Sequence, residues 1–268
     1  MPRYIGALHV HSTLSDGRLT PEQIREKAIA EGLDFVVLAE HARYLWPARL
    51  SAALEVCRRL SSDEFLLALG LEVERGGYHA LVLCEGDGLE RGDVERVVDE
   101  PGSVREIGGM VIWAHPAGTY AWTLRAGIGR EYDGWEVWSG LADGAVPSLP
   151  MLRVFLEQLA SGRRQLIAVG GTDFHGGGRR FSPLLEVEMD WLDVGCLIRA
   201  LRSKRYRVVA RVGEGPEMSA EGEVDGLPFY AKPYSAARFA LLRVRAALKL
   251  ILGFLWHATH RTHKQEIS

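Results

Sequence analysis

Histidines and carboxylates stand at the ends of short apolar runs throughout the first two thirds of the chain. Six histidines are placed in this way: His9, His11, His41, His79, His115 and His175. Five of them end or follow an apolar run, His79 opens one, and Asp16, Glu72 and Asp173 are placed similarly. A single buried histidine is usually a hydrogen-bonded structural residue, but packing does not explain so regular a pattern. Neutral imidazole and carboxylate together suit Zn, Mn or Fe, so the pattern predicts a metal centre.

Two of these groups have the spacing of neighbours on one face of a strand. His9 and His11 are separated by one residue, as are Asp173 and His175. Successive side chains of a strand point to opposite faces, so each pair turns both of its members to the same side. Each pair can therefore offer two ligands to one ion.

The elements that carry these residues are short apolar runs alternating with helix-like stretches. The runs are residues 4–10, 35–39, 65–73, 79–84, 110–114, 135–138, 166–169 and 184–187. They are nearly continuous, which is typical of parallel strands covered on both faces. About seven strand–helix repeats favour an α/β fold, a distorted (β/α)7 TIM-like barrel, whose active site is built at the C-terminal ends of the strands.

Helix signals separate the runs. The sequence Thr20-Pro21-Glu22-Gln23 predicts a helix start with an N-cap threonine, a proline in the first turn and a capping-box glutamine, and Gly32 predicts its end. Further helices are expected at about 47–60, 149–161 and 194–203. Trp113, Trp122, Trp135 and Trp138 are expected to pack in the core or at its rim, and stacking on a base or a sugar is the alternative.

Three segments are expected: a hydrolase domain over residues 1–212, a Gly-, Glu- and Pro-rich linker over 213–233, and a basic amphipathic helical tail over 234–268. Residues 229–268 carry a net charge of +6, and the remainder carries −9. Such a tail can lie on an anionic membrane surface, pack on the acidic body or another subunit, or contact nucleic-acid phosphates. Its apolar part is too short for a transmembrane span, which needs roughly 20 residues.

The composition is that of an ordinary globular enzyme of 268 residues, with 47% hydrophobic and 25% charged residues. A net charge of −3 gives no overall indication of nucleic-acid binding. The three cysteines are widely spaced, which argues against a disulfide framework, and no signal-peptide pattern is present. We therefore expect a cytoplasmic protein, membrane-associated only through its tail.

The motifs together resemble the PHP (polymerase and histidinol phosphatase) family. Residues 4–41 read YIGALHVHSTLSDGRLTPEQIREKAIAEGLDFVVLAEH and are similar to that family's opening, H-x-H, then S-D-G, then T-D-H. The similarity continues through GLEVE at 70–74, the His79 strand, AHP at 114–116 and GTDFH at 171–175. It covers roughly residues 4–210 and fills all nine usual ligand positions with the expected residue types.

The resemblance implies two or three divalent ions. One would be held by His9, His11, Glu72 and Asp173. Glu72 would bridge to a second ion, held also by His79 and His115. A third would be held by Asp16, His41 and His175. One position departs from the family pattern, because Glu40 stands where aspartate is usual. A longer carboxylate could change metal affinity if it orients a ligand, or it could still reach its partner after a small shift.

The chemistry that the resemblance implies is hydrolysis of a phosphate ester by a metal-bound hydroxide, with Glu72 and Asp173 as the catalytic carboxylates. Arg43, Arg179 and Arg180 stand just past ligand histidines and are candidates for phosphate binding. The substrate would be a small phosphate monoester, a nucleotide or an oligonucleotide phosphodiester. Histidinol phosphate is the alternative substrate, and a non-catalytic metal-binding domain tethered to a partner or a membrane by its tail is the alternative class.

Overall fold

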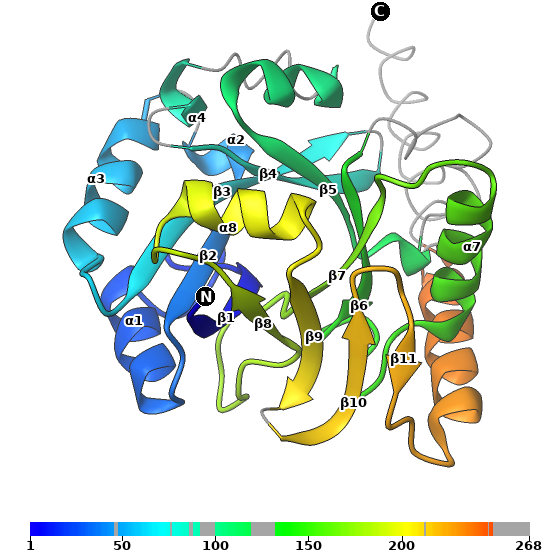
Figure 1. The fold of residues 1–268 in the computed structure, drawn as a ribbon. Coiled ribbons are helices and arrows are strands. Elements are labelled where there is room, and N and C mark those ends of the chain that lie inside the picture. Colours follow the sequence, from blue (N-terminus) through cyan, green and yellow to red (C-terminus); the bar gives the residue numbers. More distant parts are fainter. Residues whose placement is uncertain are drawn as a thin grey trace, which may run out of the picture.

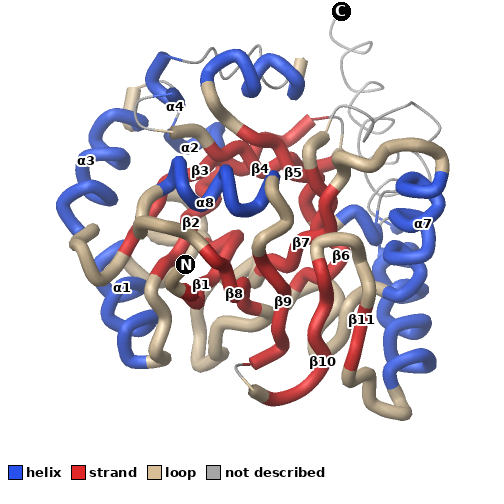
Figure 2. The backbone as a smooth tube through the Cα atoms, in the orientation of Figure 1, coloured by secondary structure: helices blue, strands red, loops and turns tan. Residues whose placement is uncertain are grey.

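The computed structural model of the chain describes residues 1–45, 48–75, 77–85, 88–91, 100–118, 132–211, 213–245 and 247–248. In this part of the chain, eleven strands form one sheet in the order β11-β10-β9-β8-β1-β2-β3-β4-β5-β6-β7. The sheet curls into a half-barrel, and helices cover its outer side (Figures 1 and 2).

The strands are β1 (Arg3–Val10), β2 (Phe35–His41), β3 (Leu66–Arg75), β4 (Tyr78–Leu83), β5 (Met110–Ala114), β6 (Gly134–Ser139), β7 (Ile167–Gly171), β8 (Leu184–Glu188), β9 (Tyr206–Arg211), β10 (Glu214–Ser219) and β11 (Val224–Asp225). The eight apolar runs coincide with β1 to β8. Pairing is parallel from β1 to β3 and from β5 to β7, but β4 is antiparallel to both β3 and β5. The expected regular alternation of strands and helices is therefore interrupted at a β3–β4 hairpin.

The end of β1 also meets the segment that follows β7. The amide of Thr172 donates to Leu8 O at 2.8 Å, the amide of His11 donates to Phe174 O at 2.8 Å, and Val10 forms a parallel bridge with Phe174. These bonds draw the C-terminal ends of β1 and β7 together. The carboxyl ends of the parallel strands consequently surround one mouth.

The helices are α1 (Pro21–Ala30), α2 (Ala42–Leu45), α3 (Leu50–Leu60), α4 (Gly88–Arg91), α7 (Leu149–Ala160) and α8 (Val194–Arg202), with 3-10 turns η1 (Pro101–Ile107) and η2 (Pro116–Gly118). Helix α1 begins with the predicted capping box, in which Thr20 accepts from the Gln23 amide and the Gln23 side chain accepts from the Thr20 amide. Gly32 follows the helix with φ 76°, a conformation that glycine adopts readily.

The core lies between the curled sheet and the surrounding helices. Trp113, Trp135 and Trp138 are fully buried there, and Trp113 and Trp135 pack edge to face with ring centroids 5.0 Å apart. These three tryptophans therefore pack in the core, as expected. Trp122 lies outside the described residues.

Residues 213–233, expected to be a linker, contain β10 and β11, which extend the sheet beyond β9. In β10 the buried residues Pro216 and Met218 alternate with more exposed ones. A strand with one exposed face has no continuous apolar run, which is why the Gly- and Glu-rich sequence of β10 resembles that of a linker.

Residues 231–245 are helical and lie beside α7 (Figure 1). Ser235 is buried, accepts a hydrogen bond from the Leu149 amide at 2.8 Å and donates one to Pro147 O at 3.2 Å. The Arg238 guanidinium donates to Ala142 O and Leu141 O. This part of the expected tail is therefore packed on the body of the protein. The remainder of the expected tail, residues 249–268, lies outside the described residues.

Among the helices that the structure describes, none combines the length and the apolar character that crossing a bilayer requires.

Candidate metal centre

All nine predicted ligands meet at the mouth formed by the strand ends. His9 is near the end of β1, and His11 and Asp16 follow that strand. His41 ends β2, Glu72 lies in β3, His115 follows β5, and Asp173 and His175 follow β7. His79, the second residue of β4, pairs with Glu74 and Ala114. Because β4 runs antiparallel, its first residues lie beside the last residues of its neighbours, which explains why this one histidine opens an apolar run.

Glu72 lies at the centre of the cluster and is 2% exposed. Its Oε1 is 2.6 Å from His79 Nδ1, 3.1 Å from His115 Nε2 and 3.6 Å from His9 Nε2. Its Oε2 is 3.2 Å from His41 Nδ1 and 3.4 Å from His11 Nε2. Each oxygen thus faces a different set of imidazoles, which is the arrangement required of a carboxylate that bridges two cations.

Asp16 and Asp173 provide the other carboxylates. Asp16 oxygens lie 3.3 Å from His41 Nε2 and 3.5 Å from His175 Nε2. Asp173 Oδ1 lies 3.5 Å from His175 Nδ1 and 3.7 Å from His11 Nε2. His11 Nδ1 lies 3.7 Å from Asp16 Oδ1, so the side chain of His11 lies between the two aspartates.

Four groups have ligand atoms within 4.8 Å of one another: His11, Asp16, His41 and His175; His9, His11 and Asp173; His9, Glu72 and His115; and His41, Glu72 and His79. The first contains the expected third set together with His11. The expected second set is divided, because His115 groups with His9 and His79 groups with His41. Glu72 belongs to both of these groups.

The side-chain nitrogens of this cluster fit metal ions. Four buried ring nitrogens have no hydrogen-bond partner among the described residues: His9 Nε2, His11 Nδ1, His11 Nε2 and His41 Nδ1. A buried polar atom without a partner costs free energy, and a coordinated cation would satisfy these atoms. The donor set of imidazole and carboxylate suits Zn, Mn or Fe.

Charges within the cluster shift the pKa values of neighbouring imidazoles in opposite directions. Burial lowers the pKa of His9, but Glu136, Glu72 and Asp173 outweigh it and hold that pKa well above its usual value. Burial and the neighbouring His9 lower the pKa of His11. Burial would raise the pKa of Glu72, but His9 and the hydrogen bonds from His115 and His79 lower it, so this carboxylate stays ionised. A cation binding here would take the place of a proton on His9 Nε2.

Left-handed backbone conformations concentrate at the ligands. Among described residues other than glycine, positive φ angles occur at His9 (66°), His115 (27°), Asp173 (47°) and Lys204 (58°). Such conformations are uncommon for residues with a Cβ and are often found at functional sites. Three of these four residues are predicted ligands, so strand ends are bent to direct these side chains into the mouth.

Glu136 is a functional candidate that the sequence analysis did not identify. It lies in β6 and is 1% exposed; its Oε1 is 2.9 Å from His9 Nδ1, and its Oε2 accepts from the His115 amide at 2.7 Å. Gly171 in β7 provides the space, because a Cβ at that position would lie 1.8 Å from Glu136 Oε1. The signal that could have identified Glu136 is the presence of a charged residue inside the apolar run of residues 135–138.

Glu40, the departure from the family pattern, does not pair with its neighbour His41. Its fully buried carboxylate accepts from the Ser12 amide at 2.8 Å and from the Ser15 hydroxyl. Burial raises the pKa of this carboxyl. Glu40 therefore holds the loop that carries Asp16.

The three arginines proposed for substrate binding lie near the mouth but differ in their contacts. Arg43, in α2, donates to Glu74 Oε2 at 2.8 Å, and its guanidinium lies 5.1 Å from the ring centroid of Tyr44. Arg179 and Arg180 are exposed on the segment that follows His175. The structure therefore places Arg43 in an existing ion pair and leaves the other two on the surface.

Comparison with protein-family profiles and with curated protein sequences gives no match. Among solved structures, a two-domain protein from Bacteroides vulgatus that contains a predicted PHP-like metal-dependent phosphoesterase aligns over 78% of this chain, with a TM-score of 0.54 and 19% identity. The chain spans 65% of the length of that protein, which is less than two thirds.

Two further structures align with TM-scores of 0.46. A candidate metal-dependent phosphoesterase from Bifidobacterium adolescentis is 20% identical, with 73% of this chain and 95% of that chain covered. An amidohydrolase from Chromobacterium violaceum with bound sulfate and no metal is 18% identical, and the alignment covers 75% of this chain and 96% of that chain. The alignment with the Bacteroides vulgatus protein shows that the chain has the fold of a PHP-like protein.

Proposed function

We propose that this protein is a metal-dependent phosphoesterase with two or three divalent ions at the mouth of a distorted (β/α)7 barrel. The observation that carries the proposal is the position of Glu72, whose two oxygens face different sets of histidines within 3.6 Å. The fold shared with a PHP-like protein supports the same class of reaction.

The expected ligands in this proposal are His9, His11, Asp16, His41, Glu72, His79, His115, Asp173 and His175. Divalent ions bound there would lower the pKa of a coordinated water toward about 7 and neutralise phosphoryl oxygens. Glu72 and Asp173 both supply negative charge at the Nε2 atoms of His9 and His11, and Glu136 holds His9 in one orientation. These residues fix the geometry that in-line displacement at phosphorus requires.

Substrate contacts in this proposal come from the arginines at the mouth. Arg179 and Arg180 are exposed beside His175 and can reach a phosphate bidentately, whereas Arg43 would first have to leave Glu74. The substrate class is a small phosphate monoester, a nucleotide or an oligonucleotide phosphodiester. Histidinol phosphate is retained as an alternative substrate because the same site chemistry serves it.

A non-catalytic metal-binding domain is the alternative class. The gathering of nine expected ligands at one mouth favours an enzyme, because each carboxylate is positioned against at least two imidazoles. We propose that the hydrolase domain extends past residue 212, since β10 and β11 belong to its sheet.

A cytoplasmic location is proposed from the three free cysteines, and membrane or subunit contact through residues 234–268 stays a proposal.

The test combines metal analysis with a substrate panel. Protein reconstituted separately with Zn, Mn and Fe would be assayed against phosphomonoesters, dinucleotides and histidinol phosphate, with Glu72→Gln as the variant. We expect hydrolysis by the wild type, loss of activity and reduced bound metal in Glu72→Gln, and no change in Glu157→Gln on the exposed face of α7. Unchanged turnover and metal content in Glu72→Gln would exclude the proposed role, and bound metal without turnover of any compound would favour the non-catalytic class.

A further inference from the structure

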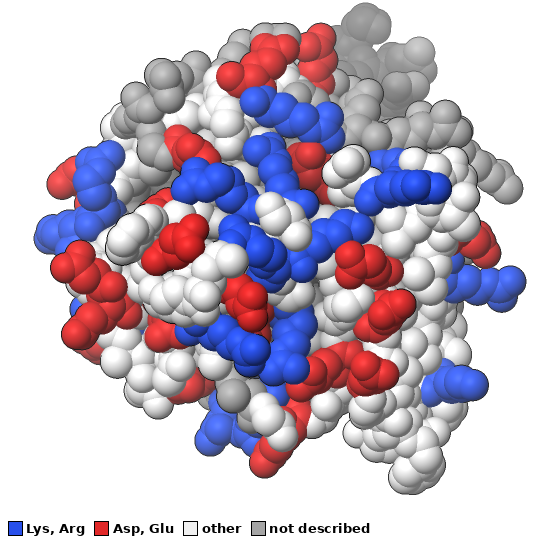
Figure 3. Space-filling view, viewed as in Figure 1, with Lys and Arg blue, Asp and Glu red and all other residues white. Residues whose placement is uncertain are grey.

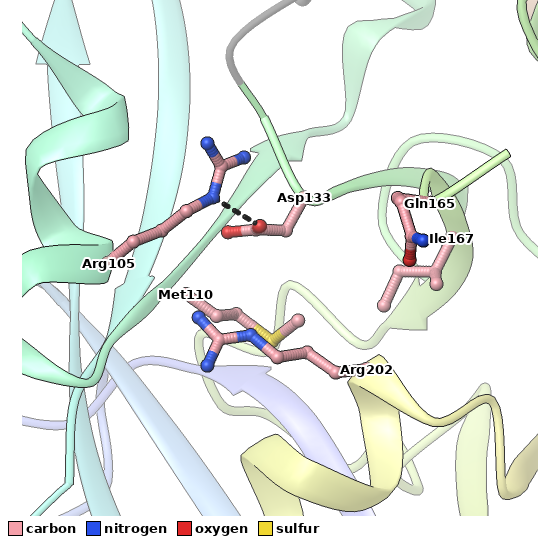
Figure 4. Close-up of a pocket in the computed structure, with 6 residues that line it drawn as sticks. All are labelled: Arg105, Met110, Asp133, Gln165, Ile167 and Arg202. Carbon is pink, nitrogen blue, oxygen red and sulfur yellow. Dashed lines mark hydrogen bonds and ion pairs between the residues drawn. The ribbon is translucent and has the colours of Figure 1, made fainter. Parts of the chain in front are cut away.

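A second cavity lies at the end of the sheet opposite the metal centre. It has a volume of about 520 Å³ and is lined by Arg105, Met110, Asp133, Gln165, Ile167 and Arg202 (Figure 4). Met110 and Ile167 are the first residues of β5 and β7, whereas His115 and Asp173 follow the last residues of these strands. At about 3.3 Å per residue, the two ends of β5 are roughly 13 Å apart, so this cavity is separate from the metal centre.

Two arginines from different elements line this cavity. Arg105 comes from η1 and Arg202 from the C-terminal end of α8 (Figure 4). Asp133 accepts from Arg105 Nε at 2.8 Å and from the Val111 amide at 2.9 Å. Both oxygens of the one lining carboxylate are therefore engaged by the protein, and Oδ1 holds Arg105 in place.

Arg202 has a different environment. Its Nη2 donates to the backbone oxygen of Gly109, which fixes the side chain against the edge of the cavity. Among the described residues, no carboxylate forms an ion pair with Arg202, in contrast to Arg199 on the same helix, which pairs with Glu85 at 3.1 Å. The charge of Arg202 is thus available to a ligand.

The surroundings of the cavity add positive charge. Arg164 precedes the lining residue Gln165 and is exposed. Lys204 follows Arg202 by two residues and donates to Arg164 O at 3.2 Å, although Glu221 pairs with it at 3.4 Å. Figure 3 shows Lys and Arg side chains gathered across the middle of the face on which α8 lies in Figure 1. Such a field attracts an anion, and the guanidinium fork matches the oxygens of a phosphate.

We propose that this cavity is a second binding site, distinct from the metal centre, for the phosphate group of a small phosphorylated compound. Arg202 and Arg105 contact the phosphate oxygens, and the carboxamide of Gln165 contacts a polar group of the remainder of the ligand. The buried side chains of Met110 and Ile167 close the floor.

The test uses the full chain treated with a chelator, so that phosphate cannot bind through metals. Binding of inorganic phosphate, ribose 5-phosphate and ribose would be measured by titration calorimetry. We expect both phosphates to bind, ribose not to bind, and Arg202→Gln to weaken both phosphates at least tenfold. Arg199→Gln, on the same helix and outside the cavity, should bind as the wild type does.

A second measurement needs no variant. In wild-type protein with isotope-labelled methionine methyl groups, ribose 5-phosphate should shift the Met110 resonance and leave that of Met151 in α7 unchanged. The proposal is overturned if neither phosphate binds, if ribose binds as tightly as ribose 5-phosphate, if Arg202→Gln and Arg199→Gln bind equally, or if the Met110 resonance does not move.

Discussion

His9 Nδ1 lies 2.9 Å from Glu136 Oε1, and both side chains are completely buried. A carboxylate acceptor at this nitrogen keeps the proton on Nδ1 and leaves Nε2 facing Glu72 and Asp173. Carboxylates that accept from the second nitrogen of a ligand histidine fix its orientation and increase its basicity. We therefore predict that Glu136 is a positioning residue for the proposed metal centre.

Glu136→Gln tests this role. The amide retains an acceptor for the His115 amide but removes the negative charge beside His9, so we expect metal affinity to fall 10- to 100-fold. Metal titration of the chelator-treated protein measures the change. Glu217→Gln, on the exposed part of β10 where Glu217 pairs with Arg207, is the matched control. Affinity equal to that of the wild type in both variants would show that Glu136 has only a packing role.

Much of this centre could be predicted because its ligands occupy a repeated position relative to apolar runs. The position of His79 could not be explained from the sequence, because it follows from the antiparallel direction of β4, which is set by pairing with both β3 and β5. Glu136 was missed because its role is set by a partner 127 residues away.

The strands that were not predicted lie at the edge of the sheet. β9 to β11 bury one face, and β10 is rich in Gly and Glu, so neither hydropathy nor strand propensity separates it from a loop. Its conformation is imposed by pairing with β9, which is a tertiary interaction. The strands around the site could thus be predicted from local sequence pattern, whereas the extension of the sheet by β9 to β11 could not.

A pH dependence of stability is expected from Asp143. Burial, with a contribution from the charge of Glu136, raises the pKa of this carboxyl to about 7, although the Ser139 amide donates to it at 2.8 Å. In the unfolded chain an aspartate titrates near pH 3.9. Between these values the native state holds a proton that the unfolded state releases, so this group lowers stability as pH rises from about 4 to 7.

Asp143→Asn removes this titration. We expect the variant to gain stability relative to the wild type by at least about 1.4 kcal/mol more at pH 8 than at pH 5, which corresponds to one pKa unit. Urea unfolding at both pH values measures the difference. Asp63→Asn, on an exposed loop, is the control, and its stability should differ from that of the wild type by the same amount at both pH values. A stability difference between Asp143→Asn and the wild type that does not change with pH would contradict the raised pKa of Asp143.

Packing of the helical segment 231–245 on the body is tested by Ser235→Ala. The hydroxyl joins the first amide of α7, at Leu149, to the carbonyl of Pro147, and it is buried. Its removal leaves both groups without this partner, and we expect a loss of 1–3 kcal/mol in the free energy of unfolding. Ser51→Ala, at an exposed position of α3, is the control. Equal stability of both variants would mean that this segment does not dock in solution as described.

Glu40→Asp restores the residue that the PHP pattern has at this position. The Glu40 carboxylate spans from the Ser12 amide, at 2.8 Å, to the Ser15 hydroxyl, and both lie in the segment leading to Asp16. An aspartate is one methylene shorter, so we expect it to lose one of these two hydrogen bonds and to destabilise the protein by about 1–3 kcal/mol. Asp16 lies 3.3 Å from His41 and 3.5 Å from His175. A looser segment should therefore lower the affinity for the ion that these three residues would hold more than the affinity for the other ions. Metal content after graded chelation, measured beside urea unfolding, separates the two effects. Wild-type stability together with an unchanged order of metal release would show that the longer carboxylate is not required here.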